Sequence, residues 1–181
     1  MLLHYFRNKE NKDKKLAELL FIETIKNIQN IQNNIIKNKQ NNFNISFEIS
    51  CILFNCIFFV FKKDSNNNFT NLNQELMNLF INDLDYSFRA IGISDIKIGK
   101  TVKLYVKKYY FRLSELDNIF SDFDNNYDIF SKYLAKYKIF ENNENLIEIN
   151  SFFNDLKIFI KRCHCFNKNT DKLNLYTGLF K

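Results

Sequence analysis

Residues 80–112 decide the predicted fold; they read FINDLDYSFRAIGISDIKIGKTVKLYVKKYYFR. The stretch holds two of the chain's three glycines, Gly92 and Gly99, and because the chain has no proline these are its strongest backbone breaks. Apolar residues before the glycines recur at helical spacing, at Leu72, Leu76, Phe80, Leu84 and Phe88, with Met77, Ile81 and Ile91 in the same stripe. Apolar residues after them do the same, at Val102, Val106, Tyr109, Leu113 and Leu116. The stretch therefore predicts two amphipathic helices joined by a loop over residues 92–99.

The rest of the chain continues the helical pattern. Apolar spacing predicts further helices over residues 16–36, 47–61, 127–137 and 146–160, and no alternating pattern indicates paired strands. Thr70 or Asn71, with Gln74 following, predicts a capped start for the helix before Gly92. We expect an all-α protein of a single domain, a bundle of about six helices around a central apolar helix. The predicted divisions are a basic arm at 1–15, the helical domain at 16–165 and a loose tail at 166–181.

The most apolar segment, residues 43–61, has two interpretations. Its uncharged run lies between Glu48 and Lys62 and is 13 residues long. A membrane-spanning helix needs roughly 20 residues, and Asn55 lies in the middle of this run. The length favours a buried core helix, with peripheral or re-entrant membrane contact as the alternative.

Two short motifs resemble ligand sites without the context that such sites need. Residues 94–101, SDIKIGKT, differ by one residue from a phosphate-binding loop, but the predicted element before them is an amphipathic helix and not a buried strand. Cys163, His164 and Cys165 are metal-ligand types with no second pair of ligands at suitable spacing, so we expect them to be surface residues of the tail. The sequence therefore predicts no nucleotide, no metal and no other cofactor.

Catalytic chemistry is not indicated either. The two histidines, His4 and His164, lie near the ends of the chain, and no serine or cysteine is paired with a base at a defined place. The N-terminal residues lack the apolar core of a secretory signal, so we expect a reducing compartment and free thiols. The sequence predicts a protein that is not an enzyme.

A row of lysines follows the second glycine. Lys100, Lys103 and Lys107 are spaced to share one side of their helix, away from Val102 and Val106. The net charge of +6 adds little, because an excess of Asn, Lys, Ile and Phe runs through the whole chain. The row is either a solvated face or a docking surface for rRNA, phospholipid headgroups or an acidic partner.

Residues 80–112 also resemble the signature of the ubiquinol-cytochrome c chaperone family, the assembly factors of respiratory complex III. In that signature an Asp-x-Asp-x-x-hydrophobic-Arg helix runs into a Gly-hydrophobic-x-Asp loop and a basic helix that ends in an aromatic pair before Arg. The matching residues are Asp83, Asp85, Phe88, Arg89, Gly92, Ile93, Asp95, Gly99, Lys100, Lys103, Tyr109, Tyr110 and Arg112. Phe111 departs from the signature, since the family usually places glycine before this arginine.

The resemblance implies a helical, non-catalytic chaperone that binds newly made cytochrome b. It also implies a small partner subunit, work near the ribosomal exit tunnel, and a cytoplasmic protein peripheral to the inner membrane, or a mitochondrial one in a eukaryote. The alternative is a basic helical module that binds rRNA or a membrane surface. The expected partner-binding residues are Asp83, Asp85, Arg89, Asp95, Lys100, Lys103, Lys107, Tyr110 and Arg112.

Overall fold

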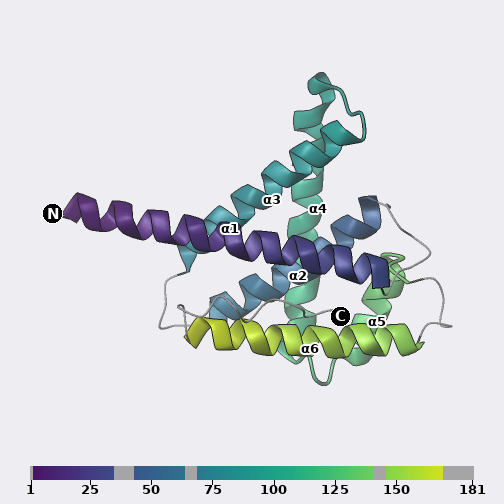
Figure 1. Cartoon of the computed structure of the whole chain (residues 1–181). Helices are drawn as coiled ribbons and strands as arrows, with labels where there is room; N and C mark the ends of the chain where they lie inside the picture. Colours follow the sequence, from purple (N-terminus) through teal and green to yellow (C-terminus); the bar gives the residue numbers. More distant parts are fainter. Residues whose placement is uncertain (1, 35–42, 64–68, 141–145, 169–181) are drawn as a thin grey trace. The chain divides into compact units, whose positions relative to one another are not determined.

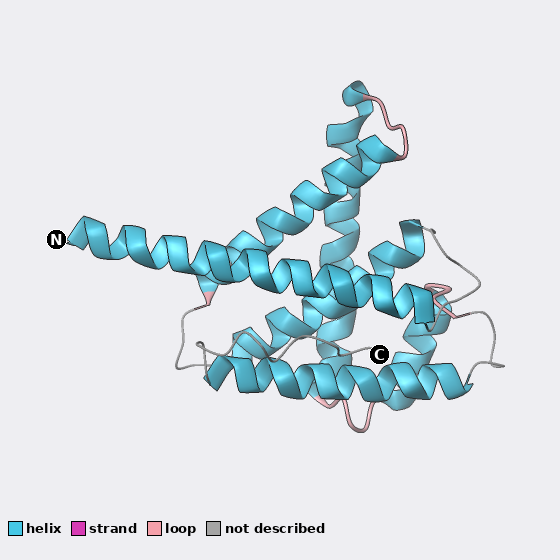
Figure 2. Cartoon of the chain, viewed as in Figure 1, coloured by secondary structure: helices cyan, strands magenta, loops and turns pink. Residues whose placement is uncertain are grey.

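A computed structural model describes residues 2–34, 43–63, 69–140 and 146–168. These residues form helices and turns without strands (Figure 1, Figure 2). The helices are α1 (Leu2–Asn34), α2 (Phe43–Lys63), α3 (Thr70–Ala90), α4 (Asp95–Ser121), α5 (Tyr127–Lys136) and α6 (Leu146–Lys168). The predicted all-α class and the number of helices are confirmed.

Several helix ends differ from the sequence-based expectation. Helix α1 begins at Leu2 and therefore runs through most of the predicted N-terminal arm, while α6 continues to Lys168, into the first residues of the predicted tail. Residues 169–181 of that tail lie outside the described residues. The expected cap of α3 is wrong, because the N-cap residue is Phe69 and makes no side-chain cap bond, while Gln74 donates to Asn78 Oδ1 at 3.0 Å.

The chain groups into two compact units. Unit 1 comprises Met1–Ile22 and Ser65–Arg112, and unit 2 comprises Glu23–Asp64 and Leu113–Lys181. Helices α1 and α4 each contribute residues to both units.

Helix α2 is the core of unit 2. Its residues from Ile49 to Ile57 are all buried, and it packs against α6. The stretch Phe43–Lys62 is long and apolar enough to cross a membrane by length and composition, but 78% of it is buried inside the protein. Asn55 is also buried and donates from Nδ2 to the carbonyl oxygen of Leu113 at 3.4 Å. This burial agrees with the predicted core helix.

Aromatic rings fill the rest of unit 2. Phe123, in the turn between α4 and α5, has its ring centroid 5.3 Å from Phe120, 5.6 Å from Phe130 and 4.4 Å from Phe153. Ring pairs at these separations stabilise a core beyond the area that they bury. The turn is therefore held by α5 and α6 as well as by its own backbone.

Unit 1 contains α3 and the first part of α4, which form a helical hairpin (Figure 1). The ring of Phe80 in α3 lies 5.0 Å from that of Tyr109 in α4, and the ring of Phe88 lies 4.9 Å from that of Tyr105. The buried residues of α3 belong to the predicted apolar stripe: Leu72, Leu76, Met77, Phe80, Leu84 and Phe88. Two other predicted members are not buried, since Ile81 is half-buried and Ile91, beyond the end of α3, is exposed. Two ring pairs thus hold the hairpin closed along its length.

The corner between α3 and α4 is a tight C-terminal cap. Gly92 has φ +87°, and its amide donates to the carbonyl of Arg89 at 3.0 Å. The amide of Ile93 donates to the carbonyl of Phe88, also at 3.0 Å. These two bonds define a Schellman motif, in which a left-handed residue ends the helix and satisfies its last carbonyls. The left-handed conformation explains the glycine at this position.

The loop is shorter than the sequence suggested. Helix α4 begins at Asp95, so only residues 91–94 connect the helices and Gly99 lies inside α4. The amides of Lys97 and Ile98 donate to the carbonyl of Ser94, at 2.9 and 3.0 Å. The GKT at residues 99–101 is therefore helical and does not form a loop that could surround a phosphate.

Substitution by alanine should have opposite effects on stability at Gly92 and at Gly99. A Cβ atom would meet nothing within 4 Å at either position, so backbone conformation alone decides the outcome. Gly92→Ala forces alanine into the left-handed region and should lower the free energy of unfolding by about 1–2 kcal/mol. Gly99→Ala, in an exposed turn of α4, should raise it by about 0.5–1 kcal/mol. Urea unfolding of both variants measures this; a stabilising Gly92→Ala contradicts the assignment of the corner.

Candidate partner-binding surface

Arg89 connects the two helices at the corner. Its Nε donates to Asp85 Oδ2 at 2.7 Å within α3, and its Nη1 bonds Asp95 Oδ1 in the first turn of α4. The bond to Asp85, followed by the bond to Asp95, raises the pKa of the Arg89 guanidinium above its usual value. The structure thus brings three of the expected partner-binding residues into one exposed ion-pair network. This network fixes the corner and leaves Asp95 largely exposed.

Asp83 lies two residues before Asp85 but outside this network. Its side chain is partly buried, and burial raises the pKa of its carboxyl above the ordinary 3.8. It makes no ion pair with the part of the chain that the structure describes. The charged form of Asp83 is therefore destabilised by loss of water, with no cation to compensate, whereas Asp85 is paired with Arg89.

One face of α4 mixes charge with exposed apolar side chains. The lysines Lys100, Lys103 and Lys107 are all exposed, as the sequence predicted. Between and beside them lie exposed apolar side chains, of which Tyr110 is one of the expected partner-binding residues and Ile96 and Leu104 are not. We call the set the α4 face, and it consists of Ile96, Lys100, Lys103, Leu104, Lys107, Tyr110 and Phe111.

The apolar members of the α4 face are strongly exposed. Ile96 is 96% exposed, Leu104 is 52% exposed, and Tyr110 and Phe111 are each 56% exposed. The spacing was visible in the sequence, since positions 96, 100, 104, 107 and 111 follow one side of a helix. Apolar spacing by itself does not tell an exposed face from a buried one. Several exposed apolar side chains on one face mark an interaction surface more often than an isolated residue does.

Aromatic rings and cationic side chains of α4 contact one another in the part of the helix that follows Leu104. The guanidinium of Arg112 lies 5.9 Å from the centroid of the Phe111 ring, and the ring of Tyr110 packs edge-on against Tyr109 at 5.9 Å. The ammonium of Lys108 lies 4.1 Å from the Tyr105 ring. Cation–π contacts of this kind orient long side chains on an exposed helix. The remaining expected residues, Tyr110 and Arg112, are therefore placed at the edge of the α4 face.

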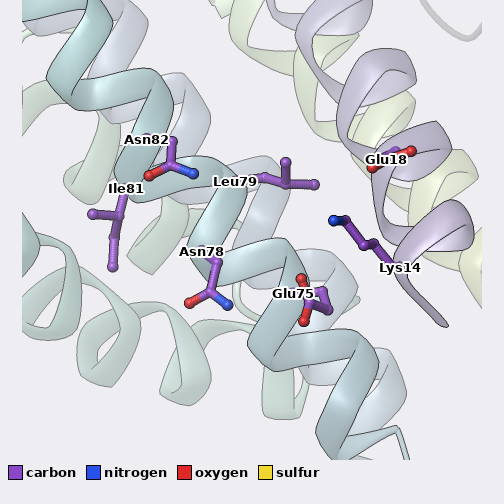
Figure 3. A pocket seen from close by; sticks show the side chains of 7 residues that line it. All are labelled: Lys14, Glu18, Glu75, Asn78, Leu79, Ile81 and Asn82. Carbon is purple, nitrogen blue, oxygen red and sulfur yellow. The ribbon is translucent and has the colours of Figure 1, made fainter. Parts of the chain in front are cut away.

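A separate cleft lies between α1 and α3 within unit 1. Its volume is about 530 Å³, and its lining residues are Lys14, Glu18, Glu75, Asn78, Leu79, Ile81 and Asn82. Figure 3 shows Lys14 extending from α1 toward Leu79 and Glu75 of α3. None of the expected partner-binding residues lines it. The cleft depends on which two helices pair, so helical spacing alone could not reveal it.

The cysteine motif of α6 differs from expectation. Cys163 is fully buried in the helix and is not a surface residue, because α6 continues past it and turns this side chain inward. Burial, followed by the proximity of Cys163, raises the pKa of the Cys56 thiol well above its usual value. The side chains of His164 and Cys165 lie outside the described residues. Within the described ranges, no three metal-ligating side chains come together.

These observations define the class of protein as an all-α protein whose candidate site is a binding face on a helical hairpin. The family described as ubiquinol-cytochrome C chaperone matches residues 39–136, more than half of the chain, and the chain belongs to this family. The match includes α2 to α5, and therefore both the corner and the α4 face. No curated protein and no solved structure matches the chain.

Asp83 predicts a pH-dependent effect on stability. Folding raises the pKa of Asp83, so the folded state binds more protons than the unfolded state at pH values just above 3.8. Protonated Asp83 therefore favours folding at low pH, and this stabilisation is lost as the pH rises through the folded-state pKa. Asp83→Asn should therefore raise Tm at pH 7, and the gain should shrink as pH falls toward 3.8. Asp85→Asn is the control, because it removes the negative charge that pairs with Arg89 and should give no gain. A gain in Tm that is independent of pH contradicts the assignment.

Proposed function

We propose that the protein is an assembly chaperone of respiratory complex III whose client is newly made cytochrome b. The observation that carries the proposal is membership of the ubiquinol-cytochrome C chaperone family over residues 39–136. Membership connects the chain with the assembly of ubiquinol-cytochrome c reductase, and a chaperone acts by binding its client. This role requires no catalytic residue and no cofactor.

The chemistry of unit 1 supports a role in binding. A chaperone for a membrane protein must offer apolar side chains to water without aggregating, and interleaved charges achieve this. The α4 face combines both features, because its lysines lie among Ile96, Leu104 and Phe111. Asp85, Arg89 and Asp95 order the corner of the same hairpin, and Asp83 lies in its first helix outside that network.

The client also determines where the protein acts. Cytochrome b is made into the membrane, so its chaperone works at the membrane surface as a peripheral protein. In a bacterium this is the cytoplasmic side of the inner membrane, and in a eukaryote it is the mitochondrial counterpart. A small partner subunit and the ribosome are the further partners that this role suggests. Contact with nucleic acid is then limited to the ribosome.

Deletion of the gene tests the proposed function. In the source organism, the deletion should lower the amounts of cytochrome b and assembled complex III while the cytochrome b transcript stays unchanged. A plasmid copy of the wild-type gene should restore both proteins. Normal complex III in a verified deletion strain contradicts the proposal.

Co-purification tests the identity of the client. A tagged copy of the full chain, purified from solubilised membranes, should retain cytochrome b in excess over a polytopic subunit of another respiratory complex. Equal recovery of the two membrane proteins would indicate a general affinity for apolar segments and no specific client.

A further inference from the structure

The α4 face has the chemistry of a membrane-interface helix. We propose that this face docks on an anionic lipid bilayer, with its lysines at the headgroups and its apolar side chains in the acyl boundary. The proposal rests on the membrane-surface placement in the proposed function and names the surface and the lipid class responsible. The following observations carry it.

The geometry suits shallow insertion along a helix. The α4 face runs from Ile96 to Phe111, a distance of about 23 Å along the axis. Apolar and basic side chains alternate along it, so Lys100, Lys103 and Lys107 can extend to headgroups while the side chains between them enter the acyl boundary. The corner adds Ile91, which is 58% exposed. The strip lies along the side of a single helix, and the cleft described in unit 1 is lined by α1 and α3 instead.

The charge of this segment is almost entirely positive. Between Asp95 and Arg112 the chain has five lysines and one arginine against the single carboxylate of Asp95. That carboxylate is bonded to Arg89, so it does not neutralise the lysines. Among the residues described, no carboxylate forms an ion pair with Lys100, Lys103 or Lys107. Their charges are therefore available to an anionic surface.

The apolar residues distinguish lipid from the other anionic partners. RNA is bound through phosphate contacts and through stacking of bases on aromatic rings or arginine. Ile96 and Leu104 have no role in either contact, yet both are strongly exposed. At a bilayer, by contrast, each aliphatic side chain leaves water and adds to the attraction of the lysines. An anionic bilayer is thus the partner that uses every member of the face.

Vesicle sedimentation with the purified full chain tests the proposal. The protein should bind vesicles of phosphatidylcholine with phosphatidylglycerol and should bind pure phosphatidylcholine vesicles weakly. The triple variant Lys100→Gln, Lys103→Gln and Lys107→Gln should lower the partition coefficient about 100-fold. The matched control is Lys15→Gln, Lys132→Gln and Lys161→Gln, which removes the same charge from exposed positions elsewhere and should retain most of the binding.

A second variant tests the apolar part. Ile96→Ser, Leu104→Ser and Phe111→Ser should leave a weaker attachment that 1 M salt abolishes, because the Debye length is then about 3 Å. Circular dichroism confirms that both variants fold, as expected for exposed positions.

Two results would overturn the proposal. One is an equal loss of vesicle binding by the lysine variant and its control. The other is loss of binding to an rRNA fragment while vesicle binding is unchanged, which would assign the face to nucleic acid. The assay contains no cytochrome b, so failure here leaves the chaperone proposal standing. Failure of the deletion experiment likewise leaves the vesicle result unaffected.

Discussion

The left-handed backbone of Gly92 is the constraint on which unit 1 depends. Without it, α3 would not end where the amide of Ile93 meets the carbonyl of Phe88, and α4 would not return along α3. The ring pairs Phe80 with Tyr109 and Phe88 with Tyr105 require this return. They in turn direct Lys103 and Lys107, on the opposite side of α4, into solvent. The exposure of the α4 face is thus a consequence of the corner.

Helical spacing predicted much of this arrangement, since the apolar set of α3 and the lysine row of α4 follow directly from the sequence. Helical spacing did not predict the features whose physical cause is not periodic. Gly99 resembles a loop residue because glycine is a weak helix former, but an exposed position in the second turn of α4 tolerates that cost. Phe69 ends up as a helix cap although its side chain cannot accept a bond. The exposure of Ile96 was not predicted, because isoleucine is usually buried.

The sequence also did not predict which helices pack against each other. The burial of Cys163 depends on α6 packing against α2, and the cleft lined by Lys14 and Glu75 depends on α1 lying beside α3. The family signature, on the other hand, could be read residue by residue, and its Asp85, Arg89 and Asp95 prove to be one bonded network. A signature of this kind records the tertiary contacts of a corner. This is why it predicted more than composition or charge did.

The pairing of α2 with α6 has a consequence for the synthesis of the protein. Helix α2 ends at Lys63, and its packing partner begins at Leu146, so some 80 residues must be added before the apolar helix is covered. At about 5–20 residues per second this takes roughly 4–16 s. During that interval the nascent chain presents to the cell a segment with the length and hydropathy of a membrane span. The chain therefore passes, while it is being made, through a stage at which its own apolar helix is uncovered.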